Sequence, residues 1–186
     1  MKGPLSAGLR YLFFVTLILW LPHAAMAGGG GQQLVVATDK SQCPNATFSR
    51  IQDAINAARA DDSIRVCKGV YTEQLRIQTS LSLQADSGAV LLPNQIQANA
   101  ASLFDSSPIA AAILVINARS VSINGLIVDG ANSGISQCSP SLVGVMFQNA
   151  SGRIDTSVIR NFKLTTDLSG CQSGNGVIVQ SGDGQS

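Results

Sequence analysis

The sequence repeats one short run three times, as ILVIN (residues 113–117), VMFQN (145–149) and VIVQS (177–181). Each run is mainly apolar and closes on Asn or Ser, and the step from the first run to the second equals the step from the second to the third. A further run, SVSINGLIV (120–128), recurs as SGRIDTSVI (151–159) after almost the same interval. Short apolar strands at a fixed period are typical of a solenoid, in which each repeat stacks on the one before. The sequence therefore predicts stacked coils in this half of the chain.

Residues 1–27 resemble an export signal rather than part of the fold. Lys2 and Arg10 are positive, residues 11–22 form an apolar core, and AMA (25–27) has the small-x-small pattern of a cleavage site. A membrane span needs about 20 apolar residues, so this core is too short for one. We predict a cleaved signal peptide over residues 1–27 and no membrane span after its removal.

The predicted mature chain, residues 28–186, is nearly neutral and has the length of one domain. Without the signal it keeps ten Lys and Arg against eleven Asp and Glu, a formal charge of −1. This balance gives no sign of a nucleic-acid partner or of an anionic membrane. A chain of this length fits one domain. We expect a secreted or periplasmic monomer.

The first half of the mature chain predicts an opening strand, a helix and further strands. The predicted elements are a strand at 34–37, a helix at 49–60, and strands at 63–67 and 72–77. Ser49 and Gln52 have the spacing of a capping box, in which each side chain binds the other residue's N–H. The predicted domain thus holds an opening strand and cap helix over 28–62, followed by coils over 63–186.

These segments resemble a known superfamily. VVA (35–37), FSRIQDAINAA (48–58) and SIRVCKGVYTEQLRI (63–77) are similar to the start of pectin lyase-like proteins, pectin methylesterases in particular. The resemblance implies an all-β fold, a right-handed parallel β-helix whose N-terminal end is plugged by an α-helix. Such a plug covers core and strand edges that would otherwise invite aggregation. The resemblance also implies an inward hydrogen-bonded ladder at Asn117 and Asn149.

The rest of the chain is less regular. Residues 81–92 predict two more short strands, and residues 93–108 predict an excursion from the stack. The sequence stops part-way through a coil, without the polar terminal coil that solenoids need. We therefore expect a stack that is incomplete at its C-terminal end, as in a fragment.

The four cysteines fit the predicted register. Cys138 and Cys171 are separated by about one coil, and each lies in a loop. Equivalent positions on adjacent coils are ~4.8 Å apart, within the Cα range of a disulfide. We predict this bond, which leaves Cys43 to pair with Cys67. A four-thiolate metal site is the alternative, but CxxC spacing is missing. Disulfides also agree with an oxidising compartment.

The chemistry of the predicted mature chain is restricted because its sequence has no histidine; His23 belongs to the signal. Ser-His and Cys-His nucleophiles and His-ligated zinc are therefore excluded within it. The resemblance implies carboxylates and arginine on the outer face instead: an Arg base in calcium-bridged lyases, paired Asp in hydrolases, and Asp-Asp-Arg in esterases. Calcium is implied only in this way, and no other cofactor is indicated. The family's catalytic signatures are missing from the sequence, so no catalytic residue is predicted.

The candidate binding residues are charged side chains of the regular coils: Asp129, Arg160, Lys163 and Asp167. Asp129 and Arg160 are separated by one step of the repeat and should be neighbours on adjacent coils. A cross-coil ion pair is the plain explanation of this spacing. Contact with a substrate is the alternative.

Two functions fit the sequence. The first is a protein that binds or processes an acidic, pectin-like polysaccharide, as a lyase, esterase or hydrolase if it is an enzyme. The second is a noncatalytic extracellular scaffold, an adhesin or glycan-binding module, which the missing signatures favour. The first rests on analogy of fold.

Overall fold

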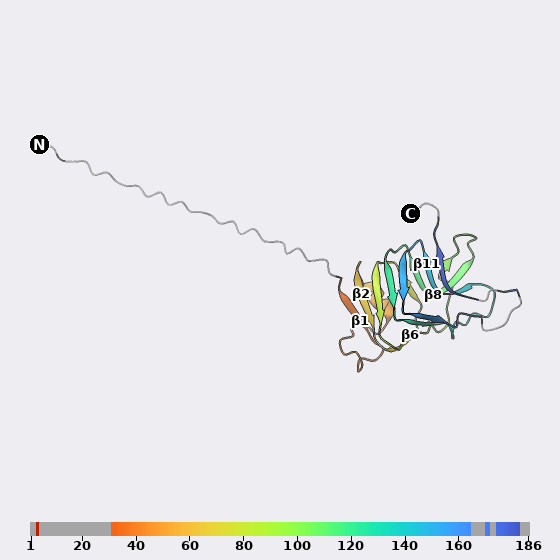
Figure 1. The fold of residues 1–186 in the computed structure, drawn as a ribbon, viewed down its shortest axis with the longest axis horizontal. Coiled ribbons are helices and arrows are strands. Elements are labelled where there is room, and N and C mark those ends of the chain that lie inside the picture. Colours follow the sequence, from red (N-terminus) through yellow and green to blue (C-terminus); the bar gives the residue numbers. More distant parts are fainter. Residues whose placement is uncertain (1–2, 4–30, 165–169, 172–173, 183–186) are drawn as a thin grey trace.

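The computed structural model describes residues 3, 31–164, 170–171 and 174–182, and these form a nearly all-β protein with one short helix (Figure 1). The predicted signal peptide, apart from Gly3, lies outside the described residues. Within the described part, no helix has the length and apolar character needed to cross a membrane.

The strands of the described residues form three sheets, named A, B and C. Sheet A contains β1 (Gln33–Val36), β2 (Asp62–Val66), β5 (Leu81–Ala85), β9 (Val121–Asn124) and β12 (Gly152–Asp155). Sheet B contains β3 (Gly69–Tyr71), β6 (Ala89–Leu91), β10 (Ile127–Asp129) and β13 (Val158–Arg160). Sheet C contains β4 (Leu75–Ile77), β8 (Pro108–Ile116), β11 (Ser141–Gln148) and β14 (Asn175–Gln180), and the short β7 (Ala100–Ala101) pairs antiparallel with β8.

The chain visits the three sheets in turn, so each circuit from A through B to C is one coil. Neighbouring coils pair in parallel, and strands of the same sheet lie side by side (Figure 1). Ile113 pairs with Val145 and Val145 with Val177, which confirms the equal steps predicted from the sequence. Val121 pairs with Gly152, which confirms the step of the second repeated run.

The core lies inside the coils and is aliphatic. Sheet A shows how it arises, because its strands alternate apolar and polar residues and therefore point them to opposite faces. Ile64, Leu83 and Ile123 are in register on consecutive coils and are all fully buried. They belong to one continuous cluster that runs through the stack.

The cap helix α1 (Ile51–Ala57) is shorter than the sequence predicted, and its cap is different. No side chain at its first residues caps it, so the predicted capping box of Ser49 is wrong. The buried carboxylate of Glu73 instead accepts the N–H groups of Ile51 at 2.7 Å and of Gln52 at 3.0 Å. Glu73 occupies the corner between β3 and β4, which is why the predicted strand at 72–77 is interrupted there.

The predicted inward asparagine ladder is also corrected. Asn117 is exposed, and Asn149 is half-buried with its Oδ1 accepting the N–H of Gly182 at 2.8 Å. Both residues have a positive φ, 53° and 47°, at the bend that leaves sheet C. Asparagine tolerates this left-handed conformation better than most residues. The repeat of Asn therefore reflects the bend of the backbone.

Both predicted disulfides are present. Cys43 and Cys67 join the loop before α1 to the end of β2, with Cα atoms 6.5 Å apart. Cys138 and Cys171 join loops of consecutive coils, with Cα atoms 5.1 Å apart. The coil register was thus sufficient to choose the pairing.

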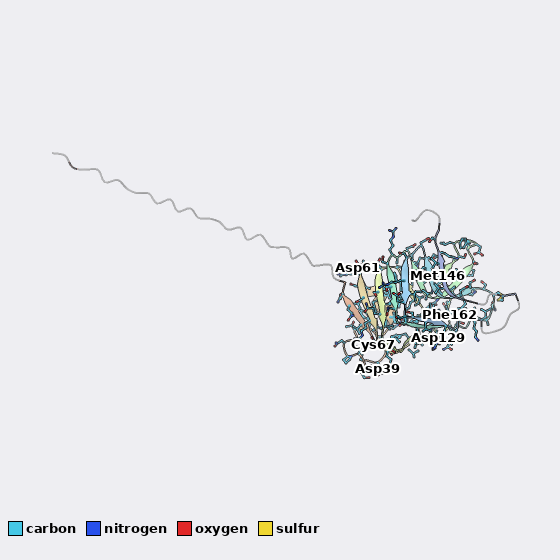
Figure 2. All side chains as sticks on the ribbon, in the orientation of Figure 1. Asp39, Asp61, Cys67, Asp129, Met146 and Phe162 are labelled. Carbon is cyan, nitrogen blue, oxygen red and sulfur yellow. A yellow bond between two sulfur atoms is a disulfide. The ribbon has the colours of Figure 1, made fainter. Side chains whose placement is uncertain are left out.

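The predicted excursion is an ordered segment, residues 93–107, which we call the strap. It covers an apolar cluster on the outer face of sheet C, and Leu114, Val143 and Met146 of that cluster are fully buried. Figure 2 marks Met146 among the strands. This outer face is therefore a second, smaller core.

The strap is fastened to four consecutive coils by alternate residues. The contacts join Gln97 to Gln74, Asn99 to Ala111, Ala101 to Gln148, and Leu103 to Gln180. All are hydrogen bonds of 2.6 to 3.2 Å between a side-chain amide and the backbone. The strap thus runs along the stack and ties the coils together.

Candidate functional site

The outer face of sheet A is polar and open to solvent. Two columns of side chains run across its coils in register: Ser63, Ser82, Ser122 and Arg153 in the first, and Arg65, Gln84, Asn124 and Asp155 in the second. Their side chains are exposed or half-buried. Neighbouring strands are ~4.8 Å apart. The face therefore offers hydroxyl, amide and guanidinium groups at a regular spacing.

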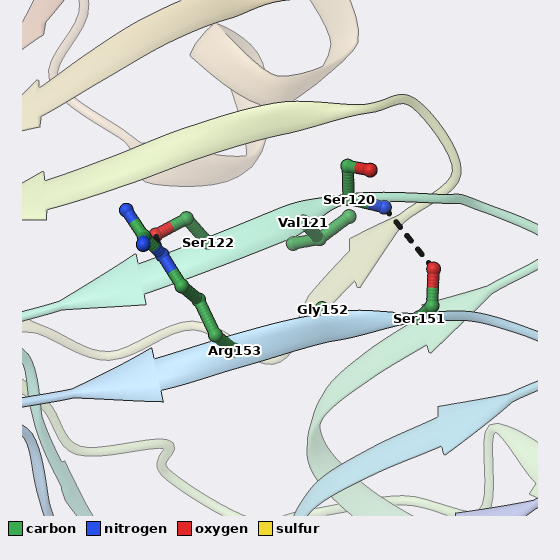
Figure 3. Close-up of a pocket in the computed structure, with 6 residues that line it drawn as sticks. All are labelled: Ser120, Val121, Ser122, Ser151, Gly152 and Arg153. Atoms are coloured by element: carbon green, nitrogen blue, oxygen red, sulfur yellow. Dashed lines mark hydrogen bonds between the residues drawn. The ribbon is translucent and has the colours of Figure 1, made fainter.

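A hollow of about 480 Å³ opens at the start of β9 and β12 (Figure 3). Its lining is formed by residues 120–122 and 151–153. The Oγ of Ser151 accepts the N–H of Ser120 at 3.3 Å. Figure 3 shows Arg153 reaching across to Ser122, whose Oγ accepts from Nε at 3.2 Å.

Arg153 is the charged group of this hollow. Its side chain is 75% exposed, and its Nε lies 3.1 Å from Oδ2 of Asp155. An exposed ion pair of this kind is weak in water, so a ligand can compete for the guanidinium. Arg donors recognise carboxylates, and Ser122 and Ser151 supply hydroxyl groups beside it. The hollow can therefore bind a ligand that carries both carboxylate and hydroxyl groups.

The predicted neighbours Asp129 and Arg160 do meet, at the end of sheet B. They are in register on β10 and β13, and Arg160 Nε donates to Asp129 Oδ2 at 2.7 Å. Oδ1 of Asp129 accepts from Asn161 Nδ2 at 2.8 Å and from the N–H of Ala131 at 3.0 Å. Figure 2 marks Asp129 near Phe162 at this corner. The ion pair thus has a structural explanation, as the spacing indicated.

Burial and hydrogen bonding act against each other on Asp129. Burial raises its pKa. The hydrogen bonds from Asn161, Arg160 and Ala131 together lower the pKa by more than burial raises it, so the pKa of Asp129 is below its usual value. The carboxylate is 9% exposed and remains ionised. Its oxygens are already bonded, which leaves it little capacity to act on a substrate.

The other two predicted binding residues are not brought into this contact. Lys163 is exposed and follows Arg160 closely in the chain. Asp167 lies outside the described residues. The arrangement therefore supports only Asp129 and Arg160 as partners of one another.

Three further carboxylates of the described residues also form hydrogen bonds or ion pairs within the protein. Asp86 binds Arg65 at 2.9 Å, and Glu73 caps α1. Asp62 accepts the N–H groups of Arg59 and Gln32, and these bonds lower its pKa. General acid–base catalysis by a pair of carboxylates needs two such groups facing a substrate. These residues do not provide such a pair.

One group of described side chains has the composition of a metal site. The sulfurs of Cys43 and Cys67 and a carboxylate oxygen of Asp86 lie within 4.8 Å of one another. Both sulfurs are joined in the disulfide and Asp86 binds Arg65. This donor set does not fit a metal in the oxidised protein, since a metal requires free thiolates.

Sequence reasoning missed the columns of sheet A. The signal was present as alternation, in SIRV (63–66), LSLQ (81–84) and VSIN (121–124). A search for a fixed period could not align them, because the step from Ser63 to Ser82 is far shorter than the step from Ser82 to Ser122, which includes the strap. Only the structure shows that these serines share one face.

Comparison with known proteins supports the fold. No protein-family model matches the chain, and no curated protein matches its sequence. A pectin methylesterase mutant in complex with hexasaccharide IV is similar, with 24% identity and a TM-score of 0.52, over 70% of this chain and 43% of that chain. A pectin methylesterase in complex with hexasaccharide VII is similar, with 21% identity and a TM-score of 0.54, over 77% of this chain and 45% of that chain.

The likeness to these two structures is one of fold. At these identities the likeness shows the fold alone, and it agrees with the stack of parallel strands described above. The matched region spans less than half the length of either solved structure. What the chains share is therefore the fold of the matched region.

Proposed function

We propose that the chain is an exported right-handed parallel β-helix that binds an acidic, pectin-like polysaccharide on the outer face of sheet A. The right hand follows from the general rule for crossovers between parallel strands, which holds in ~98% of cases. The observation that carries the proposal is the fold shared with two pectin methylesterases that hold hexasaccharides. The two disulfides agree with an exported protein.

The chemistry of the face supports this choice of ligand. A polyuronate chain offers hydroxyl groups and one carboxylate on each sugar. The columns of sheet A offer serine hydroxyls and side-chain amides, and Arg153 adds a cation at the hollow. A carboxylate at Arg153 would gain a charge-assisted hydrogen bond.

A noncatalytic role is favoured for the described coils. Asp86 and Asp129 each bind an arginine, and Glu73 caps a helix. We therefore propose binding in these coils without bond cleavage. The second candidate function, an extracellular scaffold or adhesin, rests on the same observation and needs no soluble glycan ligand.

Binding of purified full-length chain to polygalacturonate, fully methyl-esterified pectin and dextran tests the proposal. We expect polygalacturonate to bind most tightly, and Arg153→Gln to weaken it roughly tenfold, since a hydrogen bond to a charged group contributes ~1.5–3 kcal/mol. Lys40→Gln is the matched control, because it removes the same charge from an exposed position in the loop before α1. Equal affinity for polygalacturonate and dextran, or no affinity for either, would overturn the proposal.

Catalysis is measured in the same samples. Methanol release from esterified pectin reports esterase activity, and unsaturated product reports lyase activity. We expect neither from residues 1–186. Release of either product above that of a protein-free blank would show that these residues are catalytic.

A further inference from the structure

The tip of the strap carries the most exposed of the large apolar side chains that the structure describes. Phe104 is 84% exposed, and its neighbour Leu103 is 41% exposed. The other described aromatic side chains, Phe48, Tyr71, Phe147 and Phe162, are buried or half-buried. An aromatic ring contributes a large apolar surface when it is covered. Phe104 is therefore the one described aromatic ring that is largely exposed to solvent.

The turn that presents Phe104 is held in place by hydrogen bonds. The Oγ of Ser102 accepts the N–H of Phe104 at 3.2 Å, and its carbonyl accepts the N–H of Ser106 at 3.0 Å. Oδ1 of Asp105 accepts both the N–H and the Oγ–H of Ser107, at 3.1 and 2.8 Å. A ring on a turn that is already ordered loses little further freedom when it binds a ligand.

The apolar tip is small and has a polar rim. Leu103 and Phe104 are flanked by the exposed residues Asp105 and Ser106. The nearby exposed Val179 belongs to the opposite face of β14, because it is in register with the core residue Phe147. Protein interfaces bury ~800 Å² on each partner, far more than two side chains supply. A pyranose ring, with C–H groups on its face and hydroxyls at its edge, matches this size and pattern.

The tip lies close to the polar hollow of sheet A. Leu103 donates its N–H to Gln180, and an added Cβ at Gly182 would lie 3.9 Å from Leu103 Cδ1. Gly182 in turn donates its N–H to Asn149. Ser151, which lines the hollow, follows Asn149 by two residues, at most ~7 Å of chain. One oligosaccharide is long enough to reach from the hollow to the tip.

We propose that Phe104 is a stacking platform for a sugar ring of the polysaccharide that binds at sheet A. The inference rests on the proposed function and adds a second contact site to it. Arg153 and the serines bind the polar groups of one part of the ligand, while Phe104 covers the apolar face of a ring further along the chain.

Isothermal titration of hexagalacturonate into the full chain and its variants tests the inference. We expect Phe104→Ala to raise Kd about tenfold, equivalent to ~1.4 kcal/mol, and Phe104→Trp to bind at least as tightly as the parent. Val70→Ala is the matched control, because Val70 is 53% exposed on sheet B and should leave Kd unchanged.

A spectroscopic arm reports contact directly. Trp20 is the only tryptophan of the sequence, so Phe104→Trp in a Trp20→Phe background places a single fluorophore at the tip. Its emission should change on titration with hexagalacturonate, as stacking requires. If the parent binds but Phe104→Ala has the same Kd and the fluorophore does not respond, the platform is overturned and the proposed function stands. If the parent does not bind, the proposed function fails and the platform fails with it.

Discussion

The outer faces of sheets A and C are built on the same coils and have opposite characters. On sheet A the outward side chains are polar and open to water, as with Ser122 and Arg153. On sheet C the outward Leu114 and Met146 are fully buried beneath the strap. The inner faces of both sheets are apolar, and both contribute buried residues to one cluster inside the coils. The comparison teaches that the inward residues build the stack, whereas the outward residues decide whether a face is available to a ligand.

Adding a negative charge to each outer face should give the largest difference in the free energy of unfolding between the two faces. We expect Leu114→Asp to destabilise the protein by at least ~4 kcal/mol, because it removes buried apolar atoms and buries a carboxylate without a partner. Ser122→Asp on sheet A should change the free energy of unfolding by less than ~0.5 kcal/mol. Urea unfolding of both variants measures the difference. Similar values would mean that the strap does not seal sheet C.

A variant of Asp129 tests whether a polar side chain on an outer face can stabilise the fold. We expect Asp129→Asn to cost ~1–3 kcal/mol at pH 7, because it weakens bonds to a buried carboxylate. The pKa of Asp129 is lowered in the folded protein, so its stabilisation is present above the unfolded pKa of ~3.9 and is lost as pH falls through the folded pKa. The gap between parent and variant in urea midpoint should therefore close as the pH falls from about 5 through the folded pKa. A gap that stays constant with pH would contradict this assignment.

Release of the strap should have a smaller effect. Gln148 is buried, and its Nε2 donates to the carbonyl of Ala101 at 2.6 Å. We expect Gln148→Ala to cost ~1 kcal/mol and to speed amide exchange within the strap. Gln84→Ala, on the exposed face of sheet A, is the control and should have no measurable effect on either quantity. Unchanged exchange in the strap would show that apolar packing alone holds it.

The regular half of the fold could be predicted from sequence because its coils have one length. The step from Ile113 to Val145 was readable, and it selected the Cys138–Cys171 disulfide. A search for a fixed period cannot align coils of unequal length, so the serine column of sheet A was not predicted. A fixed period detects equal circuits only, whereas the register of a sheet depends on pairing across loops of any length.

The candidate site was harder to predict for a related reason. Charged residues are the natural candidates for a binding site in a sequence. Asp129 and Arg160 were predicted on that basis, but in the structure they bind each other. The cap of α1 comes from Glu73, which lies well beyond the end of the helix in the sequence. Contacts at that separation have no local pattern, and the resemblance to a family indicated the cap helix without indicating what binds its N–H groups.

The measurement that tests the account most directly is the affinity of hexagalacturonate for Ser122→Asp and Val70→Asp, compared with the parent. Each variant adds one negative charge to an exposed or half-buried outward position, the first in the hollow of sheet A and the second on sheet B. The account predicts that Ser122→Asp abolishes measurable binding by repelling the carboxylates, and that Val70→Asp binds as the parent does. Equal loss in both variants, or undiminished binding by Ser122→Asp, would contradict the claim that sheet A is the binding face.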